Sequence, residues 1–173
     1  MKMNPTDRLR RKIVIIFGVF AIIVLTMFAI YYYVVIQKTT FEDLDKTMKA
    51  VENSEKIKEI DEVHQFYEEI GYHIFEGMNE KDEAVFLFVP IESVDDESAW
   101  KTFKKKDGQD IETVEASFTK ECEDCKLHYI QPAMIEDNVL WEIVYTDESN
   151  RYVMEYVQME NGEQFERLRL EQN

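Results

Sequence analysis

The sequence has few of the residues that build catalytic and phosphate-binding loops. It contains five glycines in 173 residues, which argues against a glycine-rich cradle of backbone N–H groups for phosphate. It has no G-x-S-x-G elbow, H-E-x-x-H helix or EF-hand calcium loop. The three histidines, His64, His73 and His128, are scattered along the chain. We therefore predict a protein that acts by binding, with no catalytic, cofactor-binding or metal-binding residue.

Charge is absent from Ile13 to Ile36, a run of 24 residues. A helix rises ~1.5 Å per residue and a bilayer core is ~30 Å thick, so this run predicts a transmembrane helix over residues 13–36. The apolar region of a cleaved signal peptide would be shorter, ~7–15 residues, and small residues would follow it. Val35 to Thr39 offers no such cleavage site. The segment is therefore predicted to be an uncleaved membrane anchor.

Basic residues gather before this run. The first twelve positions contain one acidic residue, Asp7, and five basic residues: Lys2, Arg8, Arg10, Arg11 and Lys12. Such clusters stay in the cytoplasm, and the rings of Tyr31 to Tyr33 suit the lipid–water boundary at the other end. We expect residues 1–12 to be cytoplasmic and the chain from Lys38 onward to be extracellular.

The predicted extracellular part is strongly acidic. Residues 38–173 contain 15 lysines and arginines against 35 aspartates and glutamates, a net charge of −20. This charge argues against binding of nucleic acid or anionic lipid and is compatible with a basic patch on a partner protein. Lys104, Lys105 and Lys106 form the only basic run outside the anchor. We interpret them as a solvated face, with a partner contact as the alternative.

Cysteine occurs at two positions, Cys122 and Cys125. A structural zinc site needs about four nitrogen or sulfur ligands, and this pair supplies two, with His128 three residues further on. A thioredoxin-like motif would lie in a βαβ unit, whereas this pair is predicted to end a helix. An extracellular location permits a disulfide. We interpret the pair as an inert or disulfide-bonded loop, with metal contact and redox catalysis as alternatives.

The first half predicts a helix followed by antiparallel strands. A helical apolar stripe consists of Phe41, Leu44, Met48 and Val51. Period-two patterns and turn residues then predict strands at 60–69, 72–76 and 84–89, and Pro90 ends the third. A helix packed on such a sheet is an α+β layer pair, which we assign to a first module, residues 38–92.

The second half predicts the same arrangement after a connector at residues 93–109. Asp110 is expected to cap a helix whose stripe is Ile111, Val114, Phe118 and Cys122. Strands are predicted at 127–130, 139–145, 151–158 and 164–170, with a hairpin turn at Asn161-Gly162. These elements define a second module, residues 110–173.

The two halves also align with each other. Tyr72-x-Ile74-Phe75 matches Trp141-x-Ile143-Val144 at an offset of 69 residues, and 84–89 matches 152–157 at an offset of 68. This alignment predicts a duplicated module whose second hairpin loop is one residue shorter. We expect Phe86 and Trp141 to be buried in the cores.

The order of these features carries a resemblance. After the basic N-terminus and the anchor come AVFLFVP at 84–90 and NVLWEIVY at 138–145, followed by a tyrosine-rich hairpin. From about Ile60 to Leu170 the chain resembles the TseB-like (YpmB) proteins, membrane-anchored regulators of cell wall elongation in Gram-positive bacteria. The resemblance implies two tandem cystatin-like modules, the second akin to PepSY domains. It also implies control of peptidoglycan synthesis through contact with an elongation-specific penicillin-binding protein, and no catalytic residues.

Two other functions compete with this one. PepSY-like modules also occur in propeptides, so the chain could modulate or inhibit a secreted protease. An enzyme acting on wall polymers would instead need a cleft with convergent polar groups and perturbed pKa values.

Overall fold

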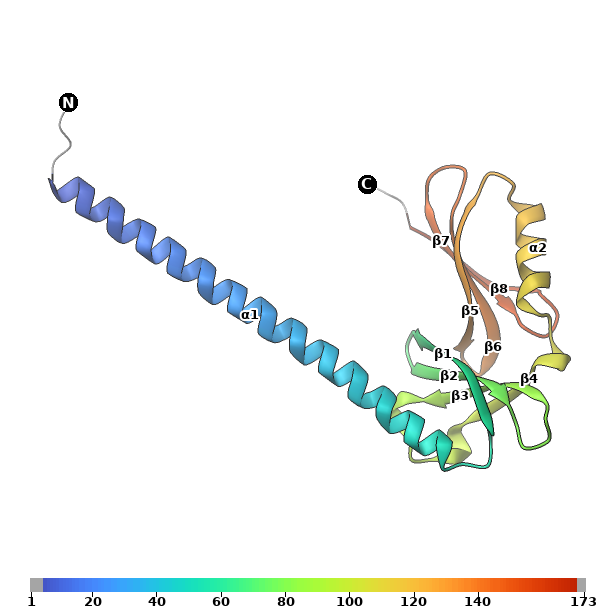
Figure 1. Cartoon of the computed structure of the whole chain (residues 1–173). Helices are drawn as coiled ribbons and strands as arrows, with labels where there is room; N and C mark the ends of the chain where they lie inside the picture. The colour runs from blue at the N-terminus through green and yellow to red at the C-terminus, as the bar shows by residue number, and fades with distance from the viewer. Residues whose placement is uncertain (1–4, 171–173) are drawn as a thin grey trace. The chain divides into compact units, whose positions relative to one another are not determined.

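The chain is α+β, with an apolar N-terminal helix followed by two antiparallel sheets (Figure 1). The computed structural model describes residues 5–170, except for the side chains of residues 5–13 and 34–42. It divides into two compact units, Met1–Leu44 and Asp45–Asn173. The elements are α1 (Pro5–Glu52), β1 (Glu59–Tyr67), β2 (Gly71–Met78), β3 (Ala84–Pro90), β4 (Lys101–Lys104), α2 (Ile111–Glu121), β5 (Lys126–Ile135), β6 (Asn138–Thr146), β7 (Tyr152–Gln158) and β8 (Gln164–Leu170).

Helix α1 contains the predicted apolar segment. Its stretch Val14–Tyr33 has a mean hydropathy of 2.8 with no buried residue, so by length and composition it can cross a bilayer. The sequence suggested a separate amphipathic helix near Phe41, but one helix runs through to Glu52. No proline or glycine occurs between residues 19 and 70 to interrupt it. The side chain of Phe41 and those of the basic cluster lie outside the described side chains.

The first sheet has the strand order β1-β2-β3-β4, and one of its faces packs on residues 45–52 of α1. Val51 is fully buried against Phe75 and Leu87, as the helical stripe predicted. Strand β4 lies inside residues 93–109, which the sequence assigned to a connector. The connector therefore also supplies the fourth strand of the first sheet. Four residues with one apolar side chain, Phe103, are too short for a period-two signal.

The second sheet has the order β5-β6-β7-β8, with α2 on one face (Figure 1). Asp110 caps α2 as predicted, because its carboxylate accepts from the Thr113 N–H at 2.8 Å. Val114 and Phe118 of the predicted stripe are buried. Strand β5 continues five residues past its predicted end, through Pro132. Proline is tolerated there because β5 is an edge strand.

The strand pairing corrects the alignment of the two halves. The last residue pair before the β2–β3 loop, here called the first hairpin loop, is Met78 with Ala84. The last pair before the β6–β7 loop, the second hairpin loop, is Thr146 with Tyr152. The two loops are therefore equally long, and the prediction of a shorter second loop is wrong. The offset is 68 for both strands of each hairpin, so His73 corresponds to Trp141. A shift of one residue matters because it moves every side chain to the other face of the sheet.

The hairpin loops confirm the corrected alignment. In the first loop the Asn79 N–H donates to the Glu83 carbonyl at 3.0 Å, and in the second the Asp147 N–H donates to the Arg151 carbonyl at 2.9 Å. The loop residues Asp82 and Asn150 both have positive φ, 55° and 61°. The initial strands β1 and β5 each carry a register shift at matching places. The duplication thus extends from sequence to hydrogen bonding.

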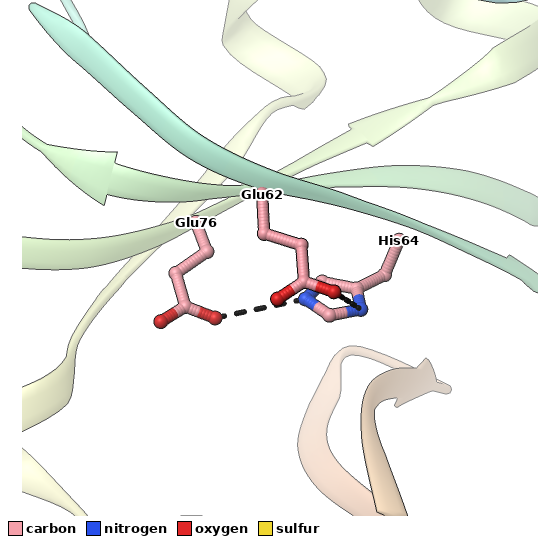
Figure 2. A group of neighbouring side chains, drawn as sticks. All are labelled: Glu62, His64 and Glu76. Carbon is pink, nitrogen blue, oxygen red and sulfur yellow. Dashed lines mark ion pairs between the residues drawn. The ribbon is translucent and has the colours of Figure 1, made fainter.

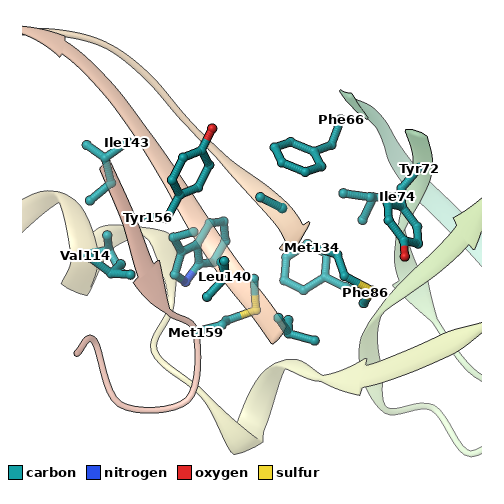
Figure 3. Packing of buried hydrophobic residues seen from close by; sticks show 14 of the residues in the cluster. Phe66, Tyr72, Ile74, Phe86, Val114, Met134, Leu140, Ile143, Tyr156 and Met159 are labelled. Atoms are coloured by element: carbon teal, nitrogen blue, oxygen red, sulfur yellow. The ribbon is translucent and has the colours of Figure 1, made fainter. Parts of the chain in front are cut away.

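The two sheets share one hydrophobic core within residues 45–173. Phe86 and Trp141 are buried as predicted, with 1% and 3% exposure. Their rings meet edge to face with centroids 5.6 Å apart, and Phe66 meets Tyr156 in the same way at 6.3 Å. Figure 3 shows side chains from both sheets in this cluster. Because β5 lies next to β1 and β2, the two modules pack directly on each other.

Candidate binding sites

The lysine run pairs with acids of the first sheet. The ammonium groups of Lys104 and Lys106 lie 2.9 and 2.6 Å from carboxylate oxygens of Glu83, and that of Lys105 lies 2.6 Å from Glu76. The two lysines on Glu83 lower the pKa of its carboxyl to about 2. The run therefore connects β4 and the turn after it to β2 and the first hairpin, and its charge is partly neutralised there.

The cysteine pair forms a disulfide. Cys122 and Cys125 are bonded to each other, with their Cα atoms 5.3 Å apart. As predicted, the pair ends a helix: the Cys122 N–H donates to the Phe118 carbonyl at the last turn of α2. Of the interpretations that the sequence left open, the structure supports the disulfide-bonded loop.

Two cavities of about 260 and 420 Å³ share lining residues on α2 and on β7 and β8. The smaller cavity is lined by Arg151, Arg167 and Arg169, which are all the arginines of residues 38–173. Four acids line the same cavity: Glu121, Asp147, Glu148 and Glu155. The acids outnumber the arginines, so the charges do not favour an anionic ligand.

Glu155 is a buried carboxylate beside these cavities. It accepts a hydrogen bond from the Tyr145 hydroxyl at 3.0 Å and pairs with the Arg167 guanidinium. Burial and the nearby Glu155 charge raise the pKa of Tyr145 to about 12. Tyr145 therefore stays protonated at neutral pH and remains a hydrogen-bond donor to this carboxylate.

Glu142 is a second buried carboxylate, next to the shared core. Its two oxygens accept from the Tyr156 hydroxyl at 2.9 Å and from the Gln131 amide at 2.7 Å. Burial and the Glu142 charge raise the pKa of Tyr156, and they raise the pKa of Tyr129 to about 12. Neither Glu142 nor Glu155 was predicted to be special among the 35 acids of residues 38–173. The available signal was an acid in the middle of an apolar strand, as in VLWEIVY.

The three histidines lie in different environments. His73 is fully buried, with Nδ1 2.8 Å from the Thr47 hydroxyl, and His128 contacts the Thr146 hydroxyl at the same distance. The ring of His64 on β1 faces the carboxylates of Glu62 on the same strand and of Glu76 on β2 (Figure 2). One potential ligand atom from each of these three residues lies within 4.8 Å of the others. The sequence does not reveal this group, because its third member comes from a neighbouring strand.

Comparison with known proteins identifies the architecture. No family model matches the chain, and no curated protein matches it in sequence. Among solved structures, the YpmB protein from Bacillus subtilis matches with a TM-score of 0.60. The match covers 73% of this chain and 95% of YpmB, at 20% sequence identity. The chain has a YpmB-like fold.

Proposed function

We propose that the chain is a membrane-anchored regulator of peptidoglycan elongation that binds a penicillin-binding protein outside the cytoplasm. The observation that carries the proposal is the YpmB-like fold, because the sequence independently resembles the TseB-like (YpmB) family. In each module a helix covers one face of a four-stranded antiparallel sheet, which supports the cystatin-like character that the family resemblance implies. By the same resemblance, the second module is akin to PepSY domains.

The anchor and the charge of the chain suggest how such binding works. The exposed apolar stretch Val14–Tyr33 is long and apolar enough to anchor the chain in a membrane, and the basic residues before it support a cytoplasmic N-terminus. Two proteins held in one membrane meet at a high effective concentration, so weak contacts suffice. The net charge of −20 on residues 38–173 favours a basic partner surface. Lys104, Lys105 and Lys106 already pair with acids of the first module, so their charge is partly neutralised. We therefore expect the surface through which this chain contacts its partner to be acidic rather than basic.

Surface plasmon resonance with the full-length chain in nanodiscs tests the proposal. The probe is the extracellular part of an elongation-specific penicillin-binding protein, and a division-specific one is the matched control. We expect binding to the first, with an association rate that falls as salt rises, because charges are screened over ~8 Å at physiological ionic strength. Equal binding to both probes, or to neither, would contradict the proposed role. An association rate that does not change with salt concentration would contradict the electrostatic part of the proposal.

The topology is tested separately. A reporter that is active only outside the cytoplasm, fused after Asn173, should be active. The protein should remain in the membrane fraction at its full 20.7 kDa. A shortened, soluble form in growing cells would show that the apolar segment is a cleaved signal peptide.

A further inference from the structure

The group Glu62, His64 and Glu76 occupies one face of the first sheet. Glu62 and Glu76 are direct cross-strand partners on β1 and β2, and His64 follows Glu62 by two residues on the same face. Two like charges placed directly opposite each other destabilise a sheet. The Lys105 ammonium, 2.6 Å from Glu76, offsets part of this repulsion, and a cation shared by both carboxylates would remove more of it.

His64 provides an unused ligand atom at this place. Its Nε2 is shielded from solvent and has no hydrogen-bond partner among the described residues. It lies 3.6 Å from Oε2 of Glu76, and the side chain is 16% exposed. Tetrahedral zinc with bonds of ~2.0–2.1 Å separates its ligand atoms by about 3.3 Å. A movement of a few tenths of an ångström, about 0.3 Å, therefore brings these two atoms to ligand spacing.

The other two ligand positions, the carboxylates of Glu62 and Glu76, also suit a metal. Oε1 of Glu76 accepts from the Lys105 ammonium at 2.6 Å, which leaves Oε2 facing His64. Carboxylates that ligate metals are commonly hydrogen-bonded through their second oxygen, which fixes their orientation. Glu62 lies 3.9 Å from Nδ1 of His64 and its side chain is 67% exposed, so it is free to rotate toward Nε2.

We propose that Glu62, His64 and Glu76 bind a divalent transition metal, with Zn²⁺ as the best match. Imidazole and carboxylate ligands suit Zn²⁺, whereas Ca²⁺ and Mg²⁺ take oxygen ligands. Three protein ligands leave a fourth position for water. The metal bridges β1 and β2 on the face opposite α1. This site is independent of the proposed binding to a penicillin-binding protein.

Imidazole NMR of the ¹⁵N-labelled full-length chain in detergent micelles tests the site, since only three histidines give signals. Titration with Zn²⁺ should shift the ring nitrogens of His64, saturate near one equivalent, and leave buried His73 unchanged. The same concentration of Ca²⁺ should produce no shift. Zn²⁺ that reaches His128 before His64, or Ca²⁺ that competes equally, would overturn the proposal.

Variants complete the test through calorimetric titration with Zn²⁺. His64→Ala should abolish the one-equivalent binding, and the matched variant His128→Ala should retain it. Glu62→Gln changes an exposed side chain, so it preserves the fold and should weaken binding at least about tenfold. Zn²⁺ should also raise the unfolding temperature of the parent protein but not of Glu62→Gln. Unchanged affinity in Glu62→Gln and His64→Ala would assign the zinc to other acids and refute the site.

Discussion

The two modules have the same backbone arrangement but fill equivalent positions differently. At the offset of 68, Leu87 of the first sheet corresponds to Glu155 of the second, and Ile74 corresponds to Glu142. Both apolar residues are fully buried, and both glutamates are at least nine-tenths buried. The first module therefore uses hydrocarbon where the second uses carboxylate.

This difference shows what a sheet must supply to hold a buried charge. An unpaired carboxylate in an apolar core costs several kcal/mol, so it requires hydrogen-bond donors or a counter-ion. The second sheet supplies them from its own strands: the Tyr145 hydroxyl and Arg167 for Glu155, and the Tyr156 hydroxyl and Gln131 for Glu142. The first sheet has leucine and isoleucine and needs no such partners.

The largest expected effect tests whether the two modules fold as one. Phe86→Ala and Trp141→Ala should each lower the free energy of unfolding by ~3–5 kcal/mol, because each removes a buried aromatic side chain. Since the two rings touch across the sheets, the double variant should lose ~0.5–1.5 kcal/mol less than the sum of the single variants. Urea unfolding of the full-length chain in detergent, followed by circular dichroism, measures these losses.

Independent modules would give a different result. The two losses would then be additive, and each variant would show two transitions, only one of them shifted. A loss below about 1 kcal/mol for both variants would contradict the shared core, since large aromatic truncations in cores cost several times more.

A second prediction concerns the buried carboxylate itself. Glu155→Leu introduces the residue that the first module has at this position, but it leaves Tyr145 and Arg167 without their acceptor. We expect a loss of about 3 kcal/mol, at the lower end for a broken buried pair because the Arg167 side chain is 27% exposed. The double variant Glu155→Leu with Arg167→Leu should recover most of this loss. If the single variant is as stable as the parent, the carboxylate has no structural role.

The parts of this fold that depend on local signals were predictable from the sequence. Strand alternation located the sheets, the carboxylate of Asp110 marked the start of α2, and the apolar patterns around Phe86 and Trp141 indicated burial. Each of these signals lies within a few residues of the structure that it specifies. A strand as short as β4 gives no such signal, and Pro132 obscured the second half of β5.

Register between strands was the part that local signals did not specify. The alignment at 69 placed Tyr72 against Trp141, whereas the pairing of the strands places His73 there. For the same reason, the sequence did not reveal that Glu62 and Glu76 are cross-strand partners beside His64. Contacts between strands depend on loop length and bulges, and one residue of error exchanges the two faces.

The smallest expected effect compares the acids of the two hairpins. Glu83 pairs with Lys104 and Lys106 from outside its loop, whereas Asp147 pairs with Arg151 of its own loop. The lysine hydrogen bonds lower the Glu83 pKa from 4.5 to about 2, and Arg151 lowers the Asp147 pKa. A carboxyl group whose pKa is lower in the folded state than in the unfolded state stabilises the fold at pH values above its unfolded-state pKa. The Glu83 contribution is therefore complete above about pH 4.5 and is lost as the pH falls toward 2.

Carboxyl NMR of the full-length chain in detergent measures this difference directly. Glu83 should titrate with a midpoint near 2 in the parent protein. Lys106→Gln should raise that midpoint toward the ordinary glutamate value, because its hydrogen bond is the largest cause of the shift, and should leave the Asp147 midpoint unchanged. If Lys106→Gln moves both midpoints equally, the effect is general screening rather than a specific pair. If it moves neither, the basic run does not hold the first hairpin, and the two loops differ in sequence but not in their electrostatics.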